Sequence, residues 1–170
     1  MTTSEAAWEE QISALWADMD NHEEDEFFAK VKTLADELPA GDARALFELA
    51  CANDSTGHSD RAAPLYRKAL ATGLTGERRR RAVIQLASSL RNLGQAEESV
   101  ELLRAEREAG SDGLDDAVAG FLALALADTG QEREALSLAL TALSRHLPRY
   151  NRSLSNYAGD LAGEPAAESA

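Results

Sequence analysis

Hydrophobic residues along most of the chain recur every three or four positions, which is the period of an amphipathic α-helix. No segment alternates cleanly between apolar and polar residues, as a half-buried strand would. Three glycines, Gly57, Gly94 and Gly130, each separate an apolar helical segment from an amphipathic one that begins just after the glycine. They lie 37 and 36 residues apart. This recurrence predicts tandem helix-turn-helix units that stack into a helical repeat array.

The three segments aligned on these glycines also share a spacing of large and small apolar residues. Small side chains let the two helices of a unit approach closely, and large side chains fill the grooves between them. The positions that follow this spacing are Leu46, Leu49, Ala50, Ala62, Tyr66 and Ala69, then Val83, Leu86, Ala87, Leu90, Ser99 and Leu103, then Ala119, Leu122, Ala123, Leu126, Ala135 and Ala142. Three such segments in tandem predict an all-α fold.

The spacing resembles that of the tetratricopeptide repeat, whose unit is roughly 34 residues long. Residues 43–161 are also similar to a family of small bacterial tetratricopeptide proteins. The similarity rests on the Ala-Pro-Leu-Tyr segment Ala63–Tyr66, the connection Gly73–Glu77 and the segment Ser89–Gly94. The resemblance implies a right-handed α-solenoid that forms a homodimer, and it implies no particular activity.

Turn residues predict where the helices of the units begin and end. Asp42, Thr75 and Asp112 suit the N-cap positions of the first helices. Gly73 and Gly110 suit the left-handed residue that ends a preceding helix. Each unit is therefore expected to begin at a capping side chain and to end close to a glycine.

The segments on either side of the units are expected to cap the array, because terminal units of a solenoid shield the ends of its core. In the first of them, Asn21 followed by Glu24 predicts a capping box at the start of a helix. We expect one domain at residues 4–162 and a flexible tail at 163–170. The parts of this domain are a helical hairpin at 4–40, units at 42–74, 75–110 and 112–146, and a C-terminal helix at 148–162.

The chain is acidic, with a formal net charge of −13. Nucleic-acid binding depends on cationic side chains, so this charge argues against a nucleic-acid partner. The longest apolar run, at 117–127, is far shorter than the ~20 residues of a membrane span. The first ten residues are acidic and lack the apolar core of a secretory signal. We therefore expect a cytoplasmic protein that does not associate with membranes.

Candidate catalytic groups are few. The three histidines, His22, His58 and His146, lie far apart, and none has a second ligand at the spacing of a zinc site. Each of the Gly-Gln turns holds a single glycine, so we expect no phosphate-binding loop. Cys51 is the only cysteine, and on a helical face it is more typical of a small buried hydrophobe than of a nucleophile. We expect no catalytic residue, no metal site and no cofactor, and hence no enzyme.

A partner-binding groove is predicted by the resemblance, since the first helix of each tetratricopeptide unit lines a concave face. Transferring this rule by position selects Arg44, Phe47, Arg81, Ile84, Ser88, Arg91, Asn92, Gly120 and Leu124. Arg81 and Arg91 are expected to grip an acidic segment, either of a partner or of the protein's own Glu23–Glu26. Alternatively, the run Arg78–Arg81 is a solvated rim whose charges pair with nearby acids.

The segment at 114–129 carries apolar residues on more faces than two neighbours would cover. Either the adjacent units and the helix at 150–161 fold over it, or it forms a homodimer seam or a partner-binding surface. The favoured function is a protein–protein interaction scaffold that self-associates and binds a protein of unknown identity. The alternative is a regulatory or sensor domain that binds an acidic peptide or a small ligand. A large apolar pocket in the third unit would favour this alternative, and a flat apolar patch on an outer helix would favour the dimer.

Overall fold

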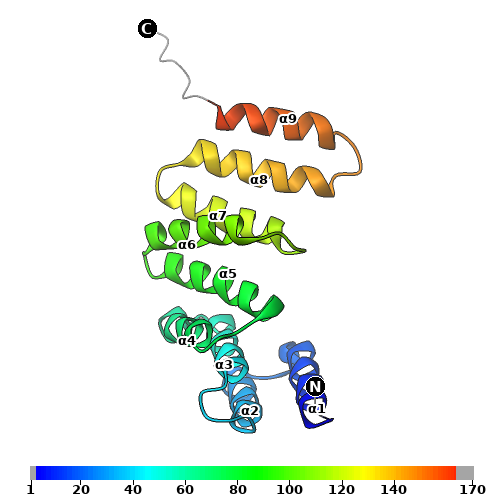
Figure 1. The fold of residues 1–170 in the computed structure, drawn as a ribbon, viewed down its shortest axis with the longest axis vertical. Helices are drawn as coiled ribbons and strands as arrows, with labels where there is room; N and C mark the ends of the chain where they lie inside the picture. The colour runs from blue at the N-terminus through cyan, green and yellow to red at the C-terminus, as the bar shows by residue number, and fades with distance from the viewer. Residues whose placement is uncertain (1–2, 164–170) are drawn as a thin grey trace. The chain divides into compact units, whose positions relative to one another are not determined.

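The computed structural model describes residues 3–163, and over this range the chain is helical without any strand (Figure 1). The elements in this range are α1 Thr3–Ala17, the 3-10 helix η1 Met19–Asn21, α2 Glu24–Asp36, α3 Ala43–Ser55, α4 Ser59–Ala71, α5 Gly76–Asn92, α6 Ala96–Ala109, α7 Asp115–Asp128, α8 Glu132–His146 and α9 Asn151–Ala162. The prediction of an all-α helical repeat fold is confirmed. The expected flexible tail lies outside the described residues from position 164 onward.

The three repeat glycines end the first helix of each unit in the same way. Their φ angles are +81° at Gly57, +77° at Gly94 and +75° at Gly130, a region that residues with a Cβ rarely adopt. The N–H of the residue after the glycine donates to the carbonyl five positions back, as Gln95 does to Leu90 at 2.9 Å. This Schellman arrangement satisfies carbonyls that the end of a helix leaves free. The glycines therefore recur because the same turn recurs.

Other helix ends follow the sequence less uniformly. Asp42 caps α3 as predicted, because its side chain accepts the N–H of Arg44 at 2.8 Å. Gly73 has the expected positive φ of +95°. Gly110 does not, since its φ of 167° is ordinary extended backbone, and the prediction of a left-handed helix end there is wrong.

Two predicted N-termini also differ. Asn21 ends η1, and its side-chain amide donates to Asp18 at 2.6 Å, so it forms no capping box with Glu24, the first residue of α2. Asp112 accepts the N–H of Leu114 at 2.8 Å in a local turn, and α7 begins only after that turn. In both places a short polar side chain bonds within the preceding turn instead of capping the helix.

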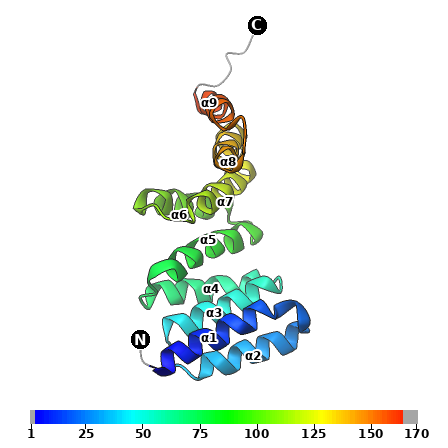
Figure 2. The same cartoon turned by 90° about the vertical axis from the view of Figure 1, so that its right-hand side faces the viewer.

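The chain forms two compact units, residues 1–89 and 90–170, and the boundary falls near the end of α5. From here on, the first unit and the second unit are these two parts of the chain, and the helix-turn-helix units of the sequence are called repeats. In the first unit, α1 packs against α2, and α3 packs against α4 (Figure 2). The core beneath α1 and α2 consists of Trp8, Ile12, Phe27, Val31 and Ala52. Between α3 and α4, small residues permit close approach, since Ala50 and Ala62 are both fully buried.

In the second unit, each helix from α6 to α9 packs against the next one. α7 packs against both α6 and α8 and buries Val118, Leu122 and Leu126 completely. α9 packs against α8, where the Ser137 hydroxyl donates to the carbonyl of Ala158 at 2.7 Å. The C-terminal helix thus covers α8, whereas the sequence analysis offered it as a cover for the 114–129 segment.

Candidate functional site

A cleft of about 670 Å³ opens in the first unit, where α3 and α5 begin. The residues that line it are Asp42, Ala43, Arg44, Thr72, Gly73, Leu74, Thr75, Glu77, Arg78 and Arg81. The cleft brings together two residues of the predicted groove, Arg44 and Arg81, and adds Arg78 to them. Because three guanidinium groups line it, the cleft is a candidate site for binding an acidic group.

Arg44 is already held by acids of the same unit. Its Nε and Nη2 donate to the Asp42 carboxylate at 3.1 and 2.9 Å, and its Nη1 lies 3.9 Å from the Glu5 carboxylate. The hydrogen bond to Asp42 raises the pKa of Arg44, and the same bond lowers the pKa of Asp42. The charge of Arg44 is therefore balanced within the unit.

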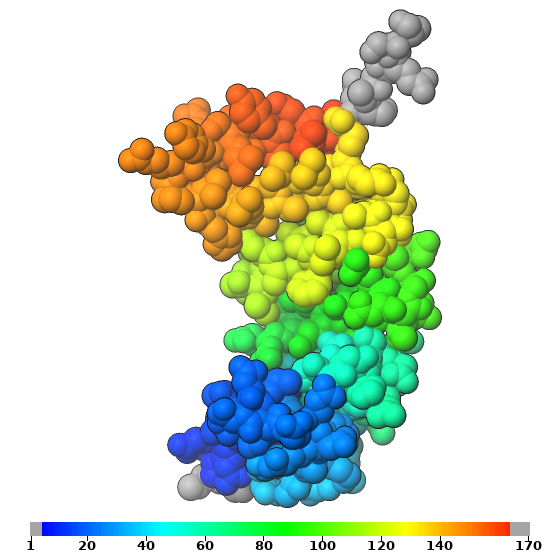
Figure 3. Space-filling model, turned by 180° about the vertical axis from the view of Figure 1, so that it is seen from behind, coloured from blue at the N-terminus to red at the C-terminus, as the bar shows by residue number. Residues whose placement is uncertain are grey.

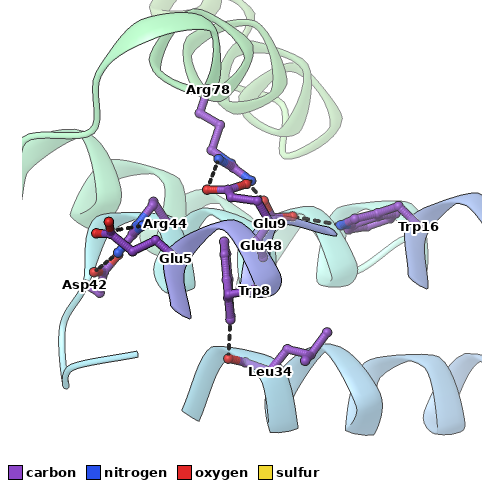
Figure 4. A network of polar contacts seen from close by, with 9 residues as sticks. All are labelled: Glu5, Trp8, Glu9, Trp16, Leu34, Asp42, Arg44, Glu48 and Arg78. Carbon is purple, nitrogen blue, oxygen red and sulfur yellow. Dashed lines mark hydrogen bonds and ion pairs between the residues drawn. The ribbon is translucent and has the colours of Figure 1, made fainter. Parts of the chain in front are cut away.

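Arg78 lies at the centre of a larger network (Figure 4). Its Nη1 and Nη2 donate to the Glu9 carboxylate at 2.9 and 2.6 Å, and its Nε donates to Oε1 of Glu48 at 2.9 Å. Glu48 is only 3% exposed, and its other oxygen accepts the indole N–H of Trp16 at 2.7 Å. Burial lowers the pKa of Arg78, but bonds to the two carboxylates outweigh it and leave that pKa raised. The acids come from α1 and α3, and Glu23–Glu26 lies outside this network.

Arg81 has no ion pair among the described residues. Its guanidinium carbon lies 5.2 Å from the centre of the Phe47 ring, which is a cation–π distance. Phe47 itself is fully buried against Tyr66, and Ile84 is 5% exposed. Both belong to the core, contrary to the prediction that they line the groove, while Ser88 is partly exposed. A partner that entered the cleft would meet the cation and not the ring beneath it.

The predicted groove residues of the second unit have varied surroundings. Arg91 forms an ion pair with Asp128, with Nε 2.5 Å from Oδ2. Asn92 is exposed, and Leu124 is 47% exposed. Gly120 is partly exposed, and a Cβ added to it would meet no atom within 4 Å. The role of these four residues in partner binding stays a prediction.

A buried polar cluster that the sequence pattern did not predict lies between α3, α4 and α5. The Cys51 thiol donates to Oε1 of Gln85 at 3.3 Å, the Ser89 hydroxyl donates to Asp54 at 2.8 Å, and the buried Tyr66 hydroxyl lies beside Cys51 and Asp54. Burial raises the pKa of Cys51 to about 12 and also raises those of Tyr66 and Asp54. A thiol with this pKa is protonated at neutral pH and is a poor nucleophile.

A stripe of leucines, here termed the α8 leucine stripe, runs along one face of α8 in the second unit. Leu136 and Leu143 are each 49% exposed, and Leu140 and Leu147 are partly exposed. Their spacing of four, three and four residues places them on one face and is typical of a coiled-coil seam. Side chains of α8, coloured yellow to orange, reach the surface in Figure 3. The spacing is visible in the sequence, but there it cannot be told from the core leucines of the same repeat.

A second cleft of about 680 Å³ lies beside α8 and the end of α9. It is lined by Arg107, Gly130, Gln131, Glu132, Arg133, Glu134, Ser137, Leu138, Thr141, Leu161 and Ala162. Most of these residues are polar or charged. The cleft thus combines these side chains with the apolar Leu138, Leu161 and Ala162.

The part of the chain that the structure describes shows neither a candidate metal site nor a membrane span. Within it, no three or more histidine, cysteine, aspartate or glutamate side chains are grouped so that they could hold a metal ion. None of the described helices is long and apolar enough to cross a membrane.

Consecutive helices that pack together, with a Schellman turn inside each repeat, define a helical repeat protein. The family model described as tetratrico peptide repeat matches residues 43–161, which is well over half of the chain. The chain belongs to the tetratricopeptide repeat family. The match begins with α3, so α1 and α2 lie outside it. A search of curated proteins finds no match.

Proposed function

We propose that this protein is a cytoplasmic protein–protein interaction scaffold without catalysis of its own, and that it forms a homodimer through the α8 leucine stripe. Tetratricopeptide repeats in general mediate protein–protein interactions. The observation that carries the self-association is the exposure of this stripe, since a soluble chain rarely leaves a regular row of leucines uncovered. We also propose that residues 4–162 act as one domain.

The charge distribution supports a second copy as the partner at this surface. The chain has a net charge of −13, but residues 132–163 carry four arginines and only three acids. Two copies of a strongly acidic protein repel each other over most of their surfaces. The near-neutral end around α8 is where they can approach at the lowest electrostatic cost.

The ends of α8 favour an antiparallel pair. Glu132 and Glu134 lie in its first turn beside Arg133, and Arg145 and His146 lie in its last turn, where both also contact Asp116 of the same copy. Antiparallel pairing brings the acidic end of one copy to the basic end of the other, which also aligns the two helix dipoles favourably. In this register Leu136 of one copy faces Leu143 of the other, a self-complementary contact around a twofold axis.

Sedimentation equilibrium tests the proposal. The wild-type chain should be a dimer, Leu143→Glu should be a monomer, and Leu93→Glu should remain a dimer. Leu93 is a matched control, because it is 43% exposed but lies outside α8. A monomeric wild type would refute self-association, whereas a dimeric Leu143→Glu variant would refute only the stripe as its site.

Cysteine cross-linking tests the orientation of the two helices. The native Cys51 is buried, with its pKa raised to about 12, and can stay in place. An oxidised mixture of Leu136→Cys and Leu143→Cys chains should form a disulfide-linked dimer, and each variant alone should not. Cross-linking of each variant with itself would show a parallel pair instead.

A regulatory or sensor domain that binds an acidic peptide is the second candidate. The observation that favours it is Arg81, whose guanidinium group faces the first-unit cleft without an ion pair among the described residues. Titration calorimetry with a glutamate-rich peptide should then show binding that weakens in high salt and is lost in Arg81→Gln. Equal heats for wild type and variant would count against this candidate.

A further inference from the structure

Both tryptophans of the chain lie in α1, and both are anchored to the first unit by directed hydrogen bonds (Figure 4). The indole N–H of Trp8 donates to the carbonyl of Leu34 at 2.8 Å, and that of Trp16 donates to Glu48 at 2.7 Å. Trp8 is 3% exposed. Each ring therefore contributes a specific polar contact in addition to its buried apolar area.

Two carboxylates of α1 meet two arginines on the same surface. Glu9 accepts two N–H groups of Arg78 in a bidentate arrangement, and Glu5 lies 3.9 Å from Arg44. The guanidinium carbons of both arginines also lie 5.6 Å from the centre of the Trp8 ring. α1 contains three glutamates and no basic residue. An acidic, tryptophan-bearing helix is thus bound by a surface that presents two arginines to it.

α1 makes these contacts with one face only. The side chains that face the rest of the unit are Glu5, Trp8, Glu9, Ile12 and Trp16, which recur at helical spacing. Leu15 is partly buried and also packs against this core. The exposed residues between them are Ala6, Ala7, Glu10, Gln11, Ser13 and Ala14. A helix that presents one amphipathic face to a groove has the geometry of a helical ligand.

The two arginines beneath α1 are also held by acids that do not belong to α1. Asp42 holds Arg44 through two hydrogen bonds, and Glu48 holds Arg78 through its Nε. If α1 left, Nη1 and Nη2 of Arg78, one oxygen of Glu48 and the Leu34 carbonyl would be open to a new partner. The family match also begins at residue 43, so the matched repeats do not include α1.

We propose that this α1-binding surface is a recognition site for an acidic amphipathic helix of a protein partner, and that α1 occupies it in cis. The partner helix carries carboxylates at its first and fifth positions, an aliphatic residue at its eighth, and tryptophans at its fourth and twelfth, as α1 does from Glu5 onward. Its binding requires that α1 leave, so the docking of α1 controls access. This inference goes beyond the proposed function, because it concerns the first unit and a different partner.

A labelled peptide with the sequence of residues 3–17 is the probe, and fluorescence anisotropy measures its binding to the full chain. Docked α1 lowers the apparent affinity of the wild type in proportion to the fraction of open chains. Trp8→Ala in the chain weakens docking, so this variant should bind the peptide at least about tenfold more tightly than the wild type. Adding Arg78→Gln, or replacing both peptide glutamates at positions 5 and 9 with glutamine, should remove most of this gain.

A Trp8→Ala chain that keeps its helical dichroism but binds no peptide would overturn the proposal. Equal affinity for the glutamate and glutamine peptides would overturn it as well. Because Trp8→Ala can impair folding, hydrogen exchange of the wild type is the second measurement. Amides of α1 should exchange at least about tenfold faster than those of α2 and α3 under native conditions. Exchange of α1 only together with α2 and α3 would show that it never leaves the site, and would refute the inference.

Discussion

Replacing Glu48 with glutamine should destabilise the first unit by about 2 kcal/mol, because one buried carboxylate serves two donors. Glu48 is 3% exposed and accepts the Arg78 Nε–H at 2.9 Å and the Trp16 indole N–H at 2.7 Å, one on each oxygen. Glutamine has the same shape but only one acceptor oxygen. Its amide group would therefore present a donor to the donor of either Arg78 or Trp16.

The magnitude follows from what the substitution removes. A hydrogen bond to a charged group contributes roughly 1.5 to 3 kcal/mol, and a buried donor left without an acceptor costs a similar amount. Removing one partner of an isolated buried ion pair costs about 3 to 5 kcal/mol. Arg78 keeps its bidentate bond to Glu9, so the loss of stability should fall within the lower of these two ranges.

Urea unfolding followed by tryptophan fluorescence measures this loss of stability in the unit that contains Glu48. Both tryptophans lie in α1, so their emission reports on the first unit, while far-ultraviolet dichroism reports on all helices. Glu10→Gln is the control, because Glu10 is an exposed glutamate of α1, the helix that carries both tryptophans. The control should stay within about 0.5 kcal/mol of wild type. A Glu48→Gln loss no larger than that would refute the role given to the buried carboxylate.

Three further predictions concern packing, titration and turns. Ala123→Leu should lower stability by about 1 to 3 kcal/mol through overpacking of the 7% exposed site in α7, and an unchanged melting temperature would show that the site has room. Burial raises the pKa of Asp54, so its ionisation destabilises the fold as pH rises above the ordinary value of 3.8, and protonation at low pH removes this penalty. Asp54→Asn, which keeps an oxygen for the Ser89 hydroxyl, should therefore raise the melting temperature at pH 7 and leave it unchanged near pH 3, and the reverse pattern would contradict the assignment. Gly94→Ala should cost about 1 to 2 kcal/mol because φ is +77°, measured by urea denaturation followed by dichroism, and an equal stability would indicate that the turn changes its form.

Helix number, helix order and repeat turns were predictable from the sequence, because the signals that set them are local. A glycine with positive φ and the two hydrogen bonds around it involve residues within a single turn, as at Gly57, Gly94 and Gly130. The sequence does not show which conformation or hydrogen bond a residue adopts when two local ones are available to it. Asn21 suits an N-cap but bonds back to Asp18, and Gly110 suits a left-handed turn but takes an extended conformation that any residue can adopt.

The candidate site was less predictable, because exposure depends on how helices pack and not on repeat position alone. Transferring the groove positions placed Phe47 and Ile84 on the surface, but both side chains are buried. Two other transferred positions, Arg44 and Arg81, line the first-unit cleft. It offered no means of finding Glu9, which lies 69 residues from its partner Arg78.

The run of four arginines at the start of α5 shows why charge patterns need tertiary context. Positive charge in the first turns of a helix opposes the helix dipole, so local physics gives no reason for the run. In the structure Arg78 joins the carboxylates of Glu9 and Glu48, Arg80 is 6% exposed, and Arg81 covers the Phe47 ring. Ion pairs and cation–π contacts with other helices offset the unfavourable local field. Among the described residues, Arg78 therefore fastens α1 and α3 to α5 within the first unit, whereas Arg81 forms no ion pair and lines the first-unit cleft.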